Sequence, residues 1–202
     1  MKLAASVLAA GRSVRFGGQK ISATLCEKEL VCFPIEDLKK AGIKDVLVIL
    51  SPGIDHSRIS CFFGVHKAIN VGFGEGIASS IRLSVNIVKG NFTHLLITNG
   101  DMPLFGWKNY SAMVNLSRTN SSNIVAAFSN GVFRNPAIFP ERYFAELSSL
   151  TGEDGGRTVL NRHRNDLIPY EIEDPNEVRD IDTPEDLNEV SRIMCHRPSH
   201  KM

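Results

Sequence analysis

The chain alternates short apolar runs with amphipathic stretches, and this alternation limits the folds open to it. Four runs are apolar on successive residues, which is typical of strands covered on both faces. These runs are 3–10, 45–50, 93–98 and 123–128. A shorter run at 136–139 predicts a further strand. Because strands that alternate with helices favour a parallel sheet, we expect a three-layer α/β/α fold with a mostly parallel, Rossmann-like sheet.

Helices are expected between and after these strands. They cover residues 34–42, 77–88, 107–116, 140–150, 156–163 and 183–194. In the last one, Thr183 suits the N-cap and Pro184 the first helical position. The chain has no internal repeat, low-complexity tract or long linker, so we expect one domain over 1–194 and a disordered tail over 195–202.

Charge and cysteine content exclude several classes of protein. The chain has 23 basic and 22 acidic residues, so it lacks the broad basic field that binding to nucleic acid or a membrane surface requires. The apolar stretch at the N-terminus is too short for a signal peptide or a membrane span. The four cysteines (Cys26, Cys32, Cys61 and Cys195) include no C-x-x-C pair. These features predict a cytoplasmic protein with reduced thiols, where disulfides would be unusual.

Residues 8–20, with the sequence LAAGRSVRFGGQK, place glycines and cations directly after a predicted strand. Ligands of open α/β sheets bind beyond the carboxyl ends of the strands, which singles out the loops 11–20, 51–58 and 99–105. The stretch 8–20 has the spacing of neither a P-loop nor a G-x-G-x-x-G motif. It is either a solvated surface loop or a phosphate cradle in which backbone N–H groups approach oxygens and cations offset their charge.

Two acidic segments offer carboxylates for a metal ion. Asp101, in NGDMPLF, follows a predicted buried strand and is either a turn-capping residue or a ligand of Mg²⁺, which prefers carboxylate oxygens. Asp180 and Asp182, in RDIDTPEDL, lie just before the predicted last helix, and this segment has a bland reading too, because the residues 183–186 are a good helix start by themselves. If Asp101 and Asp182 share an ion, they must converge above the sheet.

Three further segments are rich in glycine or proline. Residues 72–76 read G-x-G-x-G, but no convincing strand precedes Gly72 and no acidic residue lies near position 92, so a dinucleotide site is weakly supported. The helix that follows would offer free N–H groups to a phosphate. The segment 152–157 (GEDGGR) reads as a flexible loop, and the segment 133–140 (FRNPAIFP) contains the predicted short strand at 136–139.

The stretch 8–20 resembles the signature L-A-A-G-x-S-x-R-M-G-x-x-K of the MobA-like nucleotidyltransferases, and in particular their MocA-like branch of molybdenum cofactor cytidylyltransferases. The matching positions are Leu8, Ala9, Ala10, Gly11, Ser13, Arg15, Gly17 and Lys20. Phe16 replaces the usual methionine. The segments around Asp101 and Asp182 are similar to the family's G-D-x-P and D-I-D-T-P-E-D-L, and 152–157 resembles G-D-x-G-A-R with Glu153 in place of Asp.

This resemblance implies a role for each segment. Lys20, Arg15 and Asp101 would be catalytic, and Asp101 and Asp182 would hold Mg²⁺. Nucleotide-binding positions implied in the same way are Leu8, Ala9, Ala10, Gly11, Ser13, Gly17, Glu75, Gly76 and Ser80. Asp180 could be structural. The segment 152–157 would form a lid near the acceptor. The segment 133–140 would line the acceptor pocket through Pro136 and Phe139.

The implied reaction moves CMP from CTP onto a phosphate-bearing acceptor such as molybdopterin, with release of pyrophosphate. A molybdoenzyme or its maturation factor would be a protein partner. Two alternatives remain open at this point. The chain could use a sugar phosphate as acceptor, or it could bind a nucleotide or the pterin cofactor without turnover.

Overall fold

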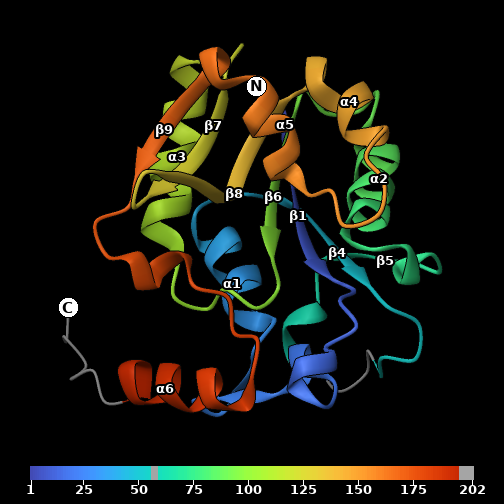
Figure 1. The fold of residues 1–202 in the computed structure, drawn as a ribbon, viewed down its shortest axis with the longest axis vertical. Coiled ribbons are helices and arrows are strands. Elements are labelled where there is room, and N and C mark those ends of the chain that lie inside the picture. Colours follow the sequence, from blue (N-terminus) through green and yellow to red (C-terminus); the bar gives the residue numbers. More distant parts are fainter. Residues whose placement is uncertain (56–58, 196–202) are drawn as a thin grey trace.

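A seven-stranded sheet forms the centre of the computed structural model, which describes residues 1–55 and 59–195 (Figure 1). Its order is β5-β4-β1-β6-β8-β7-β9. All neighbours are parallel except β8, which runs antiparallel to both β6 and β7. The strands are β1 (Leu3–Ala9), β4 (Asp45–Leu50), β5 (His66–Ile69), β6 (His94–Asn99), β7 (Ile124–Ser129), β8 (Val132–Pro140) and β9 (Leu167–Glu171).

Helices cover both faces of this sheet, as Figure 1 shows. Helices α1 (Cys32–Lys40) and α3 (Gly106–Thr119) bury their apolar side chains in the core on one face. On the other face, α2 (Ile77–Val88), α4 (Phe144–Ser148) and α5 (Gly156–Arg162) do the same. Strands β1, β4 and β6 contribute to both cores because successive side chains point to opposite faces. The predicted three-layer fold with a mostly parallel, Rossmann-like sheet is confirmed.

The last helix, α6 (Pro184–Cys195), lies apart from the sheet. It packs against a short hairpin formed by β2 (Thr24–Leu25) and β3 (Lys28–Glu29), with Leu25, Leu30, Ile181 and Val190 in a small third core. Thr183 Oγ1 accepts a hydrogen bond from the N–H of Asp186, so the predicted N-cap is confirmed. The predicted tail lies outside the described residues except for Cys195, which ends α6.

Several predicted elements differ from the structure. Residues 140–150 form a 3₁₀ turn at Glu141–Tyr143 followed by the short α4, where one helix was expected. The strands β5 and β9 were missed because they are the edge strands of the sheet and carry exposed polar residues. β5 ends three residues before Gly72, so the expectation that no strand precedes 72–76 is wrong.

The expectation of reduced thiols is also wrong in this structure. Cys26 and Cys195 form a disulfide with Cα atoms 5.7 Å apart, and Cys32 and Cys61 form a second with Cα atoms 5.4 Å apart. Sequence spacing indicates only local motifs, whereas here the fold brings distant cysteines together. None of the helices in the described part of the chain has the length and hydropathy of a membrane span.

Candidate active site

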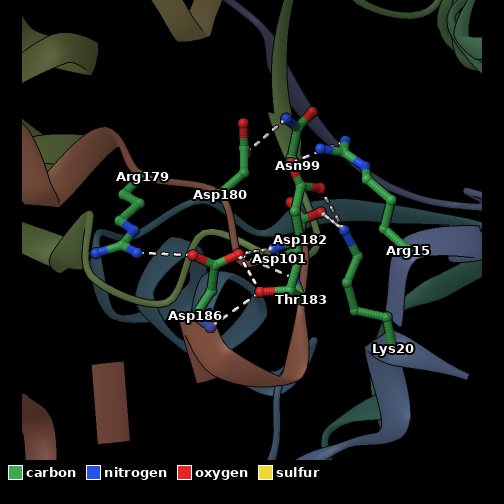
Figure 2. Close-up of polar contacts among 9 residues, drawn as sticks. All are labelled: Arg15, Lys20, Asn99, Asp101, Arg179, Asp180, Asp182, Thr183 and Asp186. Carbon is green, nitrogen blue, oxygen red and sulfur yellow. Dashed lines mark hydrogen bonds and ion pairs between the residues drawn. The ribbon is translucent and has the colours of Figure 1, made fainter. Parts of the chain in front are cut away.

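The site lies at the carboxyl edge of the sheet, where three loops meet. The loop after β1 brings Arg15 and Lys20, the loop after β6 brings Asp101, and the segment before α6 brings Asp180 and Asp182 (Figure 2). Because β8 is antiparallel to its neighbours, its first residues lie at this same edge. Residues widely separated in the sequence therefore converge on one site, as ligand sites in open α/β sheets do.

Lys20 bridges two of the aspartates. Its Nζ lies 2.5 Å from Asp101 Oδ2 and 3.2 Å from Asp182 Oδ1, and the Lys20 side chain is only 11% exposed. Arg15 forms an ion pair with the other oxygen of Asp182 at 2.9 Å. Burial alone would lower the pKa of Lys20, but the charges of Asp101 and Asp182 outweigh it, so the pKa is raised. Asp101 and Asp182 thus lie close enough to share one cation.

Asp180 lies next to this pair and ends a chain of amide hydrogen bonds. Its Oδ1 accepts a hydrogen bond of 3.0 Å from Asn99 Nδ2, and Asn99 Oδ1 accepts one of 3.1 Å from Asn135. Burial and the charge of Asp101 raise the pKa of Asp180 to about 7. A carboxyl with such a pKa at the edge of a cleft is typical of a functional site.

Asp186 fixes the segment that carries Asp180 and Asp182. Its Oδ2 accepts hydrogen bonds from the N–H groups of Asp182 and Thr183, and from the Thr183 hydroxyl. Its Oδ1 pairs with Arg179 at 2.7 Å. Hydrogen bonding to Arg179 lowers the pKa of Asp186 to about 2. The motif D-T-P-E-D therefore starts α6 and orients the backbone at Asp182 at the same time.

A cavity of about 370 Å³ opens beside the Lys20 cluster. Both the loop after β1 and the turn before α2 line it. Its lining residues are Leu8, Ala9, Ala10, Gly11, Arg12, Ser13, Val14, Lys20, Ile21, Phe73, Gly76, Ile77, Ser80, Asn99, Asp101 and Glu153. We refer to it as the larger cavity.

Gly76, which lines the larger cavity, makes a tight backbone contact with Gly152. It has φ of +95°, and a Cβ at this position would lie 2.2 Å from the carbonyl oxygen of Gly152. Only glycine fits such an approach without strain. The same Gly152 oxygen accepts a hydrogen bond from the N–H of Ala78, and the N–H of Ser79 bonds to Gly76. The first turn of α2 therefore offers fewer free N–H groups to a phosphate than the sequence suggested.

A smaller cavity of about 160 Å³ adjoins the first, because Leu8, Ile77 and Asn99 line both. Arg134 and Arg157 also line it, and neither has an ion-pair partner among the described residues. The remaining lining residues are Ile81, Ile97, Met102, Asn135, Gly155, Gly156, Leu160, Val178 and Asp180. The smaller cavity thus combines an apolar floor with two uncommitted guanidinium groups.

Most of the predicted site residues gather here. Arg15 and Asp182 join the Lys20 cluster beside the larger cavity. The predicted residues that line the cavity itself are Leu8, Ala9, Ala10, Gly11, Ser13, Lys20, Gly76, Ser80 and Asp101. Gly17 and Glu75 do not line it. Gly17 supplies a left-handed turn after the 3₁₀ residues Val14–Phe16, and the exposed Glu75 pairs with Arg82 at 2.6 Å.

Other residues take positions that the sequence did not indicate. Arg12 lines the larger cavity and donates to the carbonyl of Gly74. Glu153, expected near the acceptor, lines the larger cavity, whereas Arg157 of the same loop lines the smaller one. Of the segment 133–140, Arg134 and Asn135 reach the smaller cavity, while Phe139 is fully buried. The predicted loop 51–58 falls partly on 56–58, which lie outside the described residues.

The acidic cluster suits a hard divalent cation. Asp101 Oδ1 is buried and has no hydrogen-bond partner among the described residues, so one carboxylate oxygen is left for a ligand. Over the same residues, no group of three or more His, Cys, Asp or Glu side chains is arranged to hold a metal by itself. Mg²⁺ commonly takes only one or two carboxylates and completes its shell with water and substrate phosphate, so Asp101 and Asp182 fit it.

A mostly parallel, Rossmann-like sheet carries a glycine loop, a lysine and paired aspartates at its carboxyl edge, the edge at which open α/β sheets bind their ligands. The chain belongs to the MobA-like NTP transferase family, whose domain model matches residues 5–167. It is 25% identical to the Bacillus subtilis (strain 168) purine catabolism protein PucB, over 93% of this chain and 95% of that protein.

Solved structures share the fold. Rv0371c from Mycobacterium tuberculosis H37Rv superposes with a TM-score of 0.81 at 20% identity, over 95% of this chain and 98% of that one. The same protein has also been solved in complex with manganese. A cytidylyltransferase from Leptospira borgpetersenii serovar Hardjo-bovis gives a TM-score of 0.76 at 22% identity, over 98% and 89% of the two chains.

Proposed function

We propose that this protein is a Mg²⁺-dependent nucleotidyltransferase that moves CMP from CTP onto a phosphate-bearing acceptor of the molybdopterin type and releases pyrophosphate. One observation carries the proposal. The glycine loop after β1 places Lys20 between Asp101 and Asp182 at the edge of the larger cavity. Family membership supports nucleotide chemistry at this site, and the cytidylyltransferase of the same fold supports the choice of CTP.

In the proposed reaction, an oxygen of the acceptor phosphate attacks the α-phosphorus of CTP. A bond forms between them while the bond to the bridging oxygen breaks, and pyrophosphate leaves with that electron pair. Such a transfer depends mainly on positioning and on stabilisation of charge. Lys20 and Arg15 offset the charge of the triphosphate, and backbone N–H groups of the glycine loop orient it. Mg²⁺ held by Asp101 and Asp182 would supply further charge neutralisation at the phosphates.

The smaller cavity supports an anionic acceptor. Arg134 and Arg157 line it without ion-pair partners among the described residues, and guanidinium groups bind phosphate through paired, charge-assisted hydrogen bonds. The cavity adjoins the larger one through Leu8, Ile77 and Asn99. A phosphate held there would face the nucleotide directly. The apolar floor formed by Ile81, Ile97 and Leu160 would receive the body of the acceptor.

Pyrophosphate release tests the proposal. CTP, GTP, ATP and UTP are each incubated with Mg²⁺ and with molybdopterin or a sugar phosphate as acceptor. We expect pyrophosphate with CTP and molybdopterin, and the nucleotide adduct in mass spectrometry. Product with sugar phosphates alone would replace the acceptor in the proposal, and nucleotide binding by calorimetry without any turnover would favour a binding protein. Absence of binding for all four nucleotides would refute the proposed function.

A further inference from the structure

The two disulfides differ in how far solvent can reach them. Cys32 is fully buried and Cys61 is 8% exposed, so the apolar core encloses the bond between them. Cys195, at the end of α6, is exposed, and Cys26, in the turn of the β2–β3 hairpin, is half-buried. Thiol–disulfide exchange requires a thiolate to reach one of the sulfur atoms, so an exposed disulfide is more labile than a buried one. The bond between Cys26 and Cys195 is therefore the one that a thiol in solution can attack.

Helix α6 has little apolar packing to hold it in place. It lies apart from the sheet (Figure 1). Over Pro184–Cys195, all of which the structure describes, only Val190 is buried, whereas α2, also 12 residues long, buries seven residues. The ion pairs of Arg179 with Asp186 and Glu189 join α6 only to the segment just before it. Because helices are held mainly by packing of an apolar face, the disulfide supplies a large part of what keeps α6 against the hairpin.

The small core beneath α6 also holds the aspartates of the Lys20 cluster in place. Ile181 precedes Asp182 directly and is fully buried in this third core, which it shares with the hairpin and with Val190 of α6. The N–H of Ile181 donates a hydrogen bond of 3.0 Å to the carbonyl oxygen of Asp101. Ile181 therefore joins the two aspartates, and movement of α6 away from the hairpin would open the core that fixes it.

We propose that the disulfide between Cys26 and Cys195 is a site of thiol–disulfide exchange, and that its reduction releases α6 and weakens the binding of a divalent cation by Asp101 and Asp182. The second part of this inference rests on the proposed function, because it takes the two aspartates as metal ligands. The first part concerns only the cysteines and α6.

A dithiol is the reductant that balances the exchange. One of its thiolates attacks the sulfur of the exposed Cys195, and an S–S bond forms while the bond between Cys195 and Cys26 breaks. The Cys26 sulfur leaves with the electron pair and takes up a proton. The second thiolate of the dithiol then attacks its own sulfur in the mixed disulfide, and Cys195 leaves and is protonated in turn. Two electrons have passed to the protein, and the dithiol has become a cyclic disulfide.

Differential alkylation tests the exchange site. The native protein is incubated with a low concentration of dithiothreitol, free thiols are blocked with iodoacetamide, and the peptides are analysed by mass spectrometry. We expect alkylation of Cys26 and Cys195, while Cys32 and Cys61 stay oxidised until the protein is denatured. Reduction of both disulfides at equal rates, or of the buried one first, would overturn the inference.

Amide hydrogen exchange tests the release of α6 in the absence of any metal. Reduction should speed exchange in α6 about 10-fold or more and leave α2 unchanged, because the loss of a disulfide acts on the segment that it holds. Cys195→Ser should exchange at the fast rate before any reductant is added, and Cys26→Ser, which breaks the same bond from the hairpin, should match it. Cys61→Ser is the control, since it breaks the buried disulfide and should keep slow exchange in α6. Unchanged exchange in α6 after reduction would overturn its release.

The effect on the cation is measured with Mn²⁺ as the probe. After removal of the dithiothreitol, the Mn²⁺ affinity of the reduced protein should be about 10-fold lower than that of the oxidised protein, within the usual range of coupling between two sites. Oxidised glutathione should re-form the bond and restore the affinity, which distinguishes a switch from damage to the fold. Because coupling is reciprocal, saturating Mn²⁺ should make the disulfide harder to reduce by the same factor.

The two proposals fail separately. Oxidised wild-type protein that binds neither Mn²⁺ nor any nucleoside triphosphate refutes the proposed function, and alkylation and hydrogen exchange still decide whether the exchange site exists. Oxidised and reduced proteins that bind Mn²⁺ with equal affinity overturn the effect of the disulfide on the cation and leave the proposed function intact.

Discussion

The two adjoining cavities differ in how their positive charges are used. In the larger cavity, Lys20 is largely buried and already paired with Asp101 and Asp182. In the smaller cavity, Arg134 and Arg157 have no ion-pair partner among the described residues. Under the proposed function, Lys20 would exchange partners when a metal and a triphosphate bind, whereas the arginines could bind an anion directly. The larger cavity would then be the site of the reaction and the smaller one the site that recognises the acceptor.

The largest expected effect follows from removing the orphaned carboxylate oxygen of the larger cavity. Asp101→Asn should lower kcat by about 10³-fold or more, because a bound cation contributes several kcal/mol to stabilising the charge of a phosphoryl transition state. Pyrophosphate release at saturating CTP measures it. Asp45→Asn, at the start of β4 and the opposite edge of the sheet, is the control. Full activity of the Asp101→Asn variant would show that the larger cavity is not the site of the reaction.

Replacing the paired lysine should separate turnover from metal binding. Lys20→Met should lower kcat about 10²- to 10³-fold, the scale for losing one preorganised donor. It should also increase the affinity for Mn²⁺ in the absence of nucleotide, because Asp101 and Asp182 lose the cation they now share. Calorimetry with Mn²⁺ alone measures the second effect. Lys28→Met, which breaks the surface pair with Glu36, is the control. Weaker Mn²⁺ binding in Lys20→Met would contradict the exchange of partners.

A substitution in the smaller cavity should change the KM for the acceptor and leave the KM for CTP unchanged. Arg157→Ala should raise the KM for the acceptor about 10- to 100-fold, the value for a hydrogen bond to a charged group, while the KM for CTP stays the same. Steady-state kinetics with each substrate varied in turn measure this. The exposed Arg118 on α3 provides a matched Arg118→Ala control. A rise in the KM for CTP instead would mean that the two cavities are not separate subsites.

The smallest expected effect concerns Asp186, which holds the segment that carries Asp180 and Asp182. Asp186→Asn should cost about 1 kcal/mol of folding stability at neutral pH, as for loss of a helix cap. The pKa of Asp186 is lowered to about 2 from an ordinary value near 3.8, so its stabilising effect is present above that value and is lost as the pH falls toward 2. The difference in Tm between wild type and Asp186→Asn should therefore shrink below pH 4. A constant difference would show that the charge is not responsible.

The sequence predicted the fold and the larger cavity better than the smaller one. The larger cavity draws on consecutive residues after β1, where glycines and cations stand together. The smaller cavity takes Arg134 from β8, Arg157 from α5 and Asp180 from the segment before α6, and no local pattern relates them. Only the antiparallel direction of β8 brings Arg134 to the carboxyl edge. That direction depends on long-range pairing, which apolar periodicity does not reveal.

Buried strands were easier to predict than edge strands for a related reason. β4 matches its predicted range of 45–50 because nearly every residue in it is apolar and buried. β9 carries Pro169 and exposed residues, which an edge strand tolerates and a central one does not. Asn70, whose buried amide bonds to Gly72, Ser79 and Ser80, was missed because an isolated polar residue in the sequence gives no sign of its hydrogen-bond partners.

The disulfide between Cys26 and Cys195 closes a covalent ring of almost the whole polypeptide, with a sequence separation of 169 residues. Asp101 and Asp182 lie within this ring, and Lys20 lies on the short arm outside it. When the oxidised chain denatures, it must expand as a loop whose ends stay joined, so it occupies a smaller volume than the reduced chain. Its migration in a denaturing gel should therefore shift when a reductant is added.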